Sequence, residues 1–170
     1  MDDIQKQHER AVGDALIVEI NRKQKKQYVF NRRGDQAPDL IYRDSNLEIS
    51  IEVVSCYYDD NDAKFKWQNA KGFSGAPEGW TGVDFNEALV MSINKEIEKK
   101  CEEKAYGKNC LLAVYISPNL TTFNKMKDLM PQIKTPSKHQ FSGIYLIGYF
   151  GISGDSTVNH AIWELIPDLV

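Results

Sequence analysis

The sequence predicts a single α/β domain in which helices flank a mixed central sheet. The chain of 170 residues has the size of one globular domain, and 42% of its residues are hydrophobic, as in proteins with a packed core. Segments with the 3.6-residue period of helices alternate with short apolar runs typical of strands. Two of these runs are continuous, which indicates strands that are covered on both faces. We therefore expect one domain over residues 1–170, without internal repeats or a linker.

The first expected element is a helix of about five turns near the N-terminus. Its apolar positions recur near helical spacing, and we expect it to end before Tyr28. The stripe consists of Ile4, Ala11, Ala15, Val18 and Ile20, widened by Val12, Leu16 and Ile17. Turn-forming residues at 34–38, Gly-Asp-Gln-Ala-Pro, then lead the chain into its first strands.

A strand hairpin with a polar tip is expected over residues 39–55. The tip is Asp-Ser-Asn at 44–46, and the second strand runs from Leu47 to Ser55. In that strand the apolar residues Leu47, Ile49, Ile51 and Val53 alternate with Glu48, Ser50, Glu52 and Val54. This two-residue period is typical of a half-buried strand, and it places Glu52 and Val54 on the same face.

The rest of the chain predicts two helices, two buried strands and an edge strand. Apolar residues at helical spacing predict helices over 86–106 and 119–133, the second stopped by prolines. The apolar runs 110–116 and 143–149 predict the buried strands, and residues 161–166 predict the edge strand. Residues 58–82 show no period, so we expect a long loop there. Its aromatic residues Phe73 and Trp80 would either cover a functional site or anchor a surface loop by packing against the domain.

Composition narrows the classes of function. The net charge of −3 lacks the overall basic character of a protein that coats nucleic acid. No apolar stretch approaches the roughly 18 residues of a membrane span, and the polar N-terminus does not resemble a signal peptide, so we expect a cytoplasmic protein without membrane contact. The cysteines have no C-x-x-C spacing and favour neither a disulfide framework nor a zinc ribbon. Three scattered histidines, His8, His139 and His160, are expected at the surface.

Positive charge is nevertheless concentrated in one short segment. This basic segment consists of Arg22, Lys23, Lys25, Lys26, Arg32 and Arg33. Such a cluster could bind the phosphates of a nucleic acid. The alternative is a solvated helix end, because cations also suit the C-terminus of a helix electrostatically.

Two carboxylates form the candidate chemical site. Asp39 opens the first hairpin strand and Glu52 lies in its partner strand, so pairing across the hairpin could bring them together. Two oxygen ligands on adjacent strands suit Mg²⁺, or Mn²⁺ in its place, because such ions keep several waters for chemistry. Glu19, late in the expected first helix, could supply a third carboxylate. The alternative is that Asp39 caps a turn and Glu52 faces solvent.

The arrangement of these residues resembles a known family. Pro38-Asp39 is followed after twelve residues by Glu52-Val53-Val54 at the end of an apolar strand. This pattern, with a preceding helix and a following helix and strand, resembles the PD-(D/E)XK superfamily of restriction endonucleases, resolvases and repair nucleases over roughly residues 14–147. The resemblance implies a restriction endonuclease-like core and metal-dependent hydrolysis of phosphodiesters, with Asp39 and Glu52 holding Mg²⁺ and Glu19 assisting.

The chain departs from the family pattern at one position. The family carries a lysine two residues after the glutamate, where it positions the attacking water and stabilises negative charge, and this chain has Val54 there. Some branches take the lysine from the following helix. Along the apolar face of the helix at 86–106, Lys100 follows Ile93 and Ile97, whereas Lys95 and Lys99 turn away. Lys100 is the candidate for a migrated lysine, and the alternative is a lysine that extends from the core edge to solvent.

Three functions therefore compete. The first is a Mg²⁺- or Mn²⁺-dependent nuclease acting on DNA or RNA, with Asp39, Glu52 and Lys100 as catalytic residues and a possible homodimer as its assembly. The second is a catalytically inactive nuclease-like domain that binds nucleic acid or protein. The third is an unrelated α/β protein whose carboxylates are structural. The missing lysine and the acidic balance count against the first.

Overall fold

Six strands and three α-helices make up the described parts of the chain. The computed structural model describes residues 3–57, 85–103, 106–117, 121–151 and 158–167. Within these ranges the strands form one mixed sheet with helices on both of its faces, so the predicted α/β class is confirmed. The loop expected at 58–82 lies outside the described residues. No described helix is long and apolar enough to cross a lipid bilayer.

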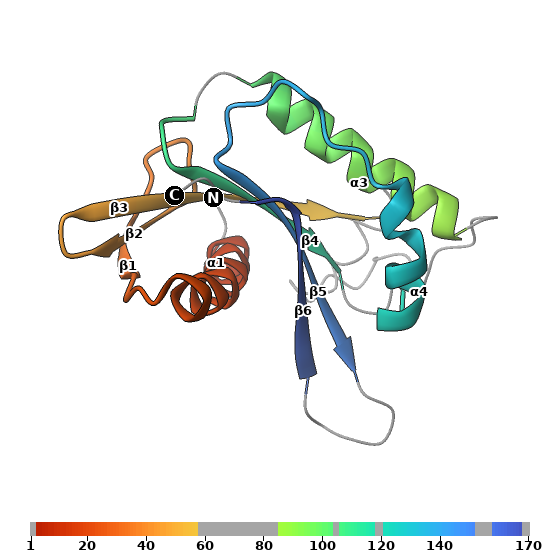
Figure 1. The fold of residues 1–170 in the computed structure, drawn as a ribbon, viewed down its shortest axis with the longest axis horizontal. Coiled ribbons are helices and arrows are strands. Elements are labelled where there is room, and N and C mark those ends of the chain that lie inside the picture. The colour runs from red at the N-terminus through yellow and green to blue at the C-terminus, as the bar shows by residue number, and fades with distance from the viewer. Residues whose placement is uncertain (1–2, 58–84, 104–105, 118–120, 152–157, 168–170) are drawn as a thin grey trace.

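The strands of the sheet follow one another in sequence order. They are β1 (Val29–Arg33), β2 (Leu40–Asp44), β3 (Leu47–Cys56), β4 (Cys110–Ile116), β5 (Gly143–Gly151) and β6 (Val158–Ile166). The first three form an antiparallel meander, β3 to β5 run parallel, and β6 returns antiparallel to β5. The sheet is strongly twisted, so that β2 and β3 cross the direction of β5 and β6 at a wide angle in Figure 1.

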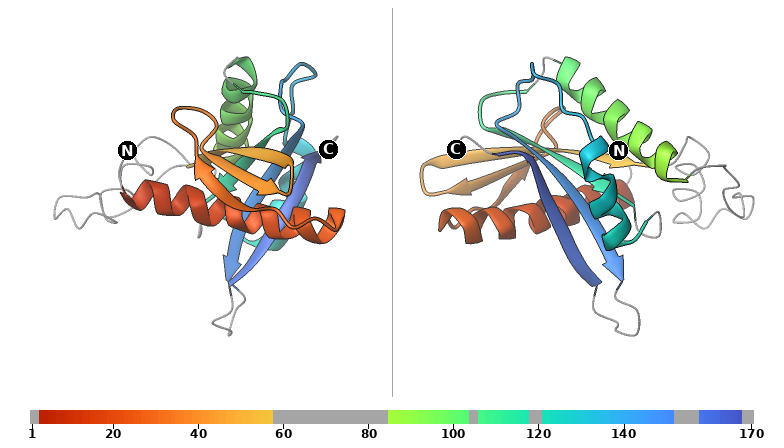
Figure 2. Two further views of the ribbon diagram at one scale, coloured as in Figure 1. Left: turned by 90° about the vertical axis from the view of Figure 1, so that its left-hand side faces the viewer. Right: turned by 45° about the vertical axis from the view of Figure 1, so that its right-hand side comes forward.

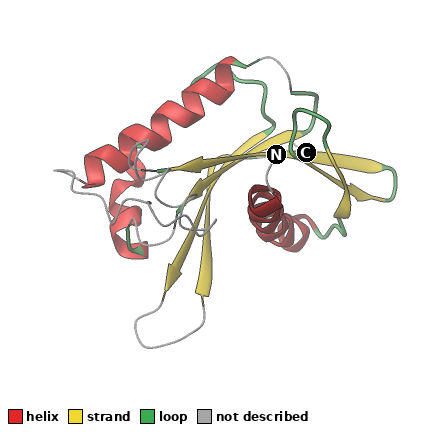
Figure 3. Ribbon diagram, turned by 180° about the vertical axis from the view of Figure 1, so that it is seen from behind, coloured by secondary structure: helices red, strands yellow, loops and turns green. Residues whose placement is uncertain are grey.

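The helices divide between the two faces. α1 (Asp3–Gln24) covers one face, and α3 (Phe85–Glu102) and α4 (Phe123–Leu129) cover the other (Figures 1 and 2). Right-handed crossovers that advance in one direction across a parallel sheet leave their helices on the same face, and α3 and α4 are the two crossover helices. α1 precedes the sheet and closes the opposite face, as the view from behind in Figure 3 also shows.

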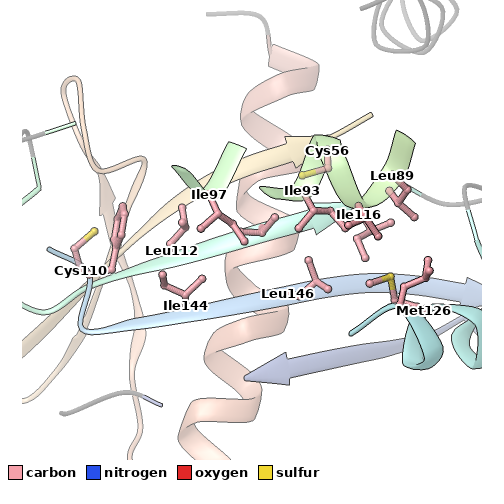
Figure 4. Packing of buried hydrophobic residues seen from close by; sticks show 14 of the residues in the cluster. Cys56, Leu89, Ile93, Ile97, Cys110, Leu112, Ile116, Met126, Ile144 and Leu146 are labelled. Atoms are coloured by element: carbon pink, nitrogen blue, oxygen red, sulfur yellow. The ribbon is translucent and has the colours of Figure 1, made fainter. Parts of the chain in front are cut away.

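Each face of the sheet has its own hydrophobic core. Under α1, the core is formed by Val12, Leu16, Ile17 and Ile20 against Leu40, Tyr42, Ile49, Ile51 and Val53. Under α3 and α4, it is formed by Leu89, Ile93, Ile97 and Met126 against Cys56, Cys110, Leu112, Ile116, Ile144 and Leu146 (Figure 4). Alternate residues of β3 thus face opposite sides. Val54 and Glu52 share the α3 side, as the two-residue period predicted.

β1 and α4 differ most from the sequence-based expectation. β1 was not predicted, because Asn31, Arg32 and Arg33 are polar and an edge strand with an exposed surface needs no apolar alternation. The helix expected over 119–133 is shorter. It ends as α4 at Leu129 and continues as the 3-10 turn η1 (Met130–Gln132), since Pro131 has no backbone N–H to extend the α-helical ladder.

Candidate metal and catalytic site

Asp39 and Glu52 are neighbours in the fold. Leu40 pairs with Ile51 in the antiparallel register of β2 and β3, so the residues next to this pair, Asp39 and Glu52, lie side by side. The Val53 backbone N–H donates to Asp39 Oδ2 at 2.9 Å. Both carboxylates are buried, with Asp39 9% and Glu52 5% exposed. Charged side chains are seldom buried unless they are paired with an opposite charge or bind a metal ion.

A tight loop sets the position of Asp39. The Gly34 N–H donates to the Asp39 carbonyl oxygen at 3.1 Å, which closes the segment between β1 and β2. A Cβ at Gly34 would lie 1.8 Å from the Pro38 carbonyl oxygen, so the backbones approach more closely than any other residue type allows. Glycine at 34 therefore holds the start of β2 against the end of β1.

The surroundings of Asp39 disfavour its ionised form. Burial and then the charge of Glu52 raise the pKa of the Asp39 carboxyl to about 7, while the hydrogen bond from Val53 N–H acts in the opposite direction. Glu9 adds a smaller rise in this pKa and Arg33 a smaller reduction. Near neutral pH the protonated and ionised forms of Asp39 are thus both populated. A bound cation would favour the ionised form.

Lys100, on α3, contacts the Glu52 carboxylate. Its Nζ donates to Glu52 Oε1 at 2.7 Å and to Glu103 Oε2 at 3.2 Å. Burial lowers the pKa of Lys100, but the bonds and charges of Glu52 and Glu103 outweigh it, and the net pKa is raised. Lys100 is therefore an ammonium ion beside Glu52. Lys95 and Lys99, on other faces of the helix, are exposed.

Tyr106 is a member of the site that sequence reasoning missed. Its hydroxyl oxygen lies 3.1 Å from Glu52 Oε1 and 2.6 Å from Glu103 Oε2, and its ring packs on Phe141 at a centroid distance of 4.7 Å. A hydroxyl carries one proton, so it donates to one carboxylate at a time. The expected helix end at Tyr106 gave no reason to link it with Glu52. The observed helix ends earlier, and the residue folds back over the site.

One oxygen of Glu52 has no partner among the described residues. Oε2 is buried and makes no hydrogen bond to any of them, although Oε1 contacts both Lys100 and Tyr106. An unpaired buried carboxylate oxygen is expensive unless something binds it. With Asp39 alongside, the two carboxylates provide the hard oxygen donors that Mg²⁺ and Mn²⁺ prefer. Within the described part of the chain, no group of three or more His, Cys, Asp or Glu side chains could hold a metal ion.

The structure does not bring Glu19 to this pair. Its carboxylate is 2.7 Å from Arg22 Nη2 and 3.8 Å from Lys23 Nζ, in a hollow lined also by Ala15, Val18 and Ile162. These cations lower the pKa of Glu19, the hydrogen bond from Arg22 most strongly. The expectation of a third carboxylate from Glu19 is thus unsupported by its position, because α1 crosses the sheet with its first half near Asp39.

Glu9 is the α1 carboxylate close to the site. It is 5% exposed, and its charge acts on Asp39. Ten residues separate it from Glu19, which is about 15 Å along a helix. Gln5 Nε2 donates to Glu9 Oε1 at 2.9 Å, and Arg33 forms an ion pair with Oε2. Both oxygens are therefore engaged. A signal existed in the sequence, since Glu9 continues the stripe of Val12, Leu16 and Ile20, all of them buried.

The basic segment does not form one surface. Arg22 and Lys23 pair with Glu19, and Lys23 also pairs with Glu164 on β6 at 3.0 Å. Arg33 turns to Glu9 and to the Lys6 carbonyl, and it alone of the six has charge acting on Asp39. The remaining members are distributed over the helix end and the edge strand: Lys25 and Arg32 are exposed, and Lys26 is half-buried.

A cleft adjoins the carboxylates. β3 continues past the start of β2, and in the described residues no strand pairs with it on that side beyond Ile51. A cleft of about 380 Å³ lies there between α1 and α3. Its lining comes from α1 (Gln5, His8 and Glu9), from the β3 region (Val53, Val54, Ser55 and Tyr57) and from α3 (Glu96, Lys99 and Lys100). Asp39 and Glu52 do not line the cleft themselves, but each is hydrogen-bonded to a residue that does, Asp39 to Val53 and Glu52 to Lys100.

Comparison with known proteins adds no relative. No protein-family model, curated protein or solved structure matches this chain. The resemblance to the PD-(D/E)XK superfamily therefore rests on Pro38-Asp39, Glu52 and the order of elements alone.

Proposed function

We propose that this protein is a metal-dependent nuclease of the PD-(D/E)XK type, which hydrolyses phosphodiester bonds of nucleic acid with Mg²⁺ or Mn²⁺. The observation that carries the proposal is the ion pair between Lys100 Nζ and Glu52 Oε1 at 2.7 Å. It supplies, from α3, the ammonium group that the family pattern places at the position of Val54. Among the described residues, Lys100 is the lysine whose ammonium group contacts the paired carboxylates.

Each residue of the site has a distinct role in this proposal. Asp39 and Glu52 would hold the divalent ion, which when bound polarises the phosphate and activates water. Glu52 is suited to this role because Oε2 is unpaired among the described residues while Oε1 is held by Lys100. The Lys100 ammonium offsets negative charge as it develops on the phosphate. Tyr106 and Glu103 hold the side chains of Lys100 and Glu52 in place through hydrogen bonds.

The inactive binding module is the second candidate, and one observation favours it. Lys100, Glu52, Glu103 and Tyr106 form a hydrogen-bonded network, and the Glu52 and Lys100 side chains are only 6% and 17% exposed. A network of this kind can stabilise a fold with no metal present. In that case Glu52 serves only to neutralise Lys100.

Cleavage of mixed DNA and RNA substrates in Mg²⁺ or Mn²⁺ separates the two candidates. Glu52→Gln keeps the size of the side chain and removes its charge. Glu48→Gln is the matched control, because Glu48 lies on the same strand but is exposed and faces Arg43. The nuclease proposal predicts activity that Glu48→Gln retains and Glu52→Gln loses. Activity that both variants keep would come from a contaminant, and absence of activity would leave the binding module.

A further inference from the structure

A second pair of polar residues lies in the cleft, outside the carboxylate site. His8 Nε2 and Ser55 Oγ are 3.0 Å apart, although the residues are 47 positions apart in sequence. His8 comes from α1 and Ser55 from β3, and both line the cleft that Lys100 and Val53 also line. The sequence-based expectation of a surface position for His8 is therefore wrong, because packing against β3 and β4 half-buries it.

The imidazole of His8 is held in one orientation. Its ring meets the Tyr115 ring edge-on, with centroids 4.6 Å apart and planes at 73°. Ser55 fixes the other side of the ring through Nε2. When the imidazole is neutral with its proton on Nδ1, the Ser55 hydroxyl donates to the lone pair of Nε2, so a proton reaches Nε2 through Ser55. Burial lowers the pKa of His8 more than the charge of Glu9 raises it, which favours this neutral form.

The proposed nuclease reaction needs a group that accepts a proton. Lys100 cannot do so, because its two carboxylate partners keep it protonated. Asp39 and Glu52 are committed to the metal ion in the proposed function. Val54 has no basic atom. Among the described residues that line the cleft, His8 is the imidazole, the side chain best suited to proton transfer near neutral pH.

Building on the nuclease function proposed above, we propose that His8 is the proton acceptor for the attacking water and that Ser55 relays the proton to it. In this step the water oxygen bonds to phosphorus while one of its O–H bonds breaks; that proton passes to Ser55 Oγ as the Ser55 hydroxyl proton passes to His8 Nε2. The bond between phosphorus and the departing ester oxygen breaks, and this oxygen takes a proton from solvent. Ser55 lies two residues beyond Val53, about 7 Å along the strand from the backbone that holds Asp39.

Cleavage rates measured against pH at saturating Mg²⁺ test this role. The wild-type rate should rise with pH as His8 loses its proton and then level off. His8→Gln should lower kcat by about 10²-fold or more, leave KM within about threefold and remove the rise. Ser55→Ala should move the midpoint of the rise with a smaller loss of rate. His139→Gln, a histidine outside the cleft, should match the wild type.

Other ionisable groups around His8 must be excluded as the source of the rise. They are Glu9 on its own helix, Tyr57 after β3, Tyr115 on β4 with Tyr149 on β5 behind it, and Glu96, Lys99 and Lys100 on α3. Asp39 is a further candidate, because its pKa of about 7 lies in the range of the rise. A rise that persists in His8→Gln belongs to one of these groups and overturns the role of His8. If His8→Gln unfolds, His8→Ala with added imidazole decides: restored cleavage supports the role and unrestored cleavage overturns it.

The outcomes separate the two proposals. Cleavage that depends on Glu52 but stays within about threefold of wild type in His8→Gln, with the same pH profile, overturns the role of His8 and leaves the nuclease function standing. Absence of any Glu52-dependent cleavage overturns both.

Discussion

Replacing Asp39 with asparagine should stabilise the metal-free protein at alkaline pH, although it removes a residue of the proposed site. Asparagine keeps the shape of the side chain and an oxygen that can accept the Val53 N–H. It removes a charge that is buried and repelled by Glu52. The gap between the ordinary pKa of 3.8 and about 7 corresponds to an upper limit of about 4 kcal/mol, at about 1.36 kcal/mol per pH unit.

Proton linkage gives the direction in which the stability changes with pH. The folded chain binds the Asp39 proton more tightly than the unfolded chain does, so the contribution of this group to stability is complete below pH of about 4. It is lost progressively as the pH rises to about 7 and stays absent above that pH. Asparagine resembles the protonated form at every pH. The advantage of the variant should therefore be small near pH 4 and largest at pH 8.

Urea unfolding in the presence of EDTA at several pH values measures this difference. Asp128→Asn, an exposed position on α4, serves as the control for the general effect of removing a negative charge. A variant that is no more stable than the wild type at pH 8, or an advantage that does not change with pH, would refute the reasoning. With Mg²⁺ in place of EDTA the order should change, because a ligand at 100 times its Kd stabilises the folded wild type by about 2.7 kcal/mol and Asp39→Asn should lose that gain.

Three further substitutions test other parts of the structure. Lys100→Met should destabilise the protein by about 3 kcal/mol, because it leaves buried Glu52 without its cation. Lys99→Met, on the exposed face, should have little effect in the same urea titration. Combining Lys100→Met with Glu52→Gln should recover part of the lost stability, and strict additivity of the two effects would contradict the pairing. Gly34→Ala should reduce the free energy of unfolding by about 2 kcal/mol and weaken metal binding, because its Cβ would lie 1.8 Å from the Pro38 carbonyl oxygen; Gly107→Ala, with no atom within 4 Å of the new Cβ, is the control. Gly13→Ala would place Cβ 2.3 Å from Leu40 Cδ1 and 2.7 Å from Tyr42 Oη in a closed core. The cost of overpacking, about 1–3 kcal/mol, should outweigh a gain in helix propensity of about 1 kcal/mol and lower the thermal unfolding midpoint. A higher midpoint than in the wild type would show that the core adjusts to the added methyl group.

Periodicity explains why much of the fold could be predicted from the sequence. The alternation along Leu47–Cys56 and the apolar runs of β4 and β5 reflect which faces are buried, and those faces are what the sheet requires. Lys100 could be singled out for the same reason, since it continues the face of Ile93 and Ile97 that packs on the sheet. β1 was not predicted, because this edge strand is held by backbone hydrogen bonds to β2, and such bonds require no hydrophobic pattern in the sequence.

The partners of the site residues depend on where elements cross. Glu9 and Glu19 both lie beside apolar positions of α1, and only the path of the helix over the sheet decides which is close to Asp39. Tyr106 and His8 likewise gain their roles from contacts with β3 residues about 50 positions away, Tyr106 with Glu52 and His8 with Ser55. No local pattern in a single sequence encodes such distances.

Direct measurement of Mn²⁺ binding tests the central claim, that Asp39 and Glu52 form a divalent metal site. Titration of free Mn²⁺ by electron paramagnetic resonance counts bound ions in the wild type, in Glu52→Gln and in the control Glu48→Gln. We expect the wild type and Glu48→Gln to bind Mn²⁺ alike, more tightly as the pH rises through about 7 and Asp39 loses its proton, and Glu52→Gln to lose this binding. Equal binding by Glu52→Gln, or no binding by the wild type at millimolar Mn²⁺, would contradict the site.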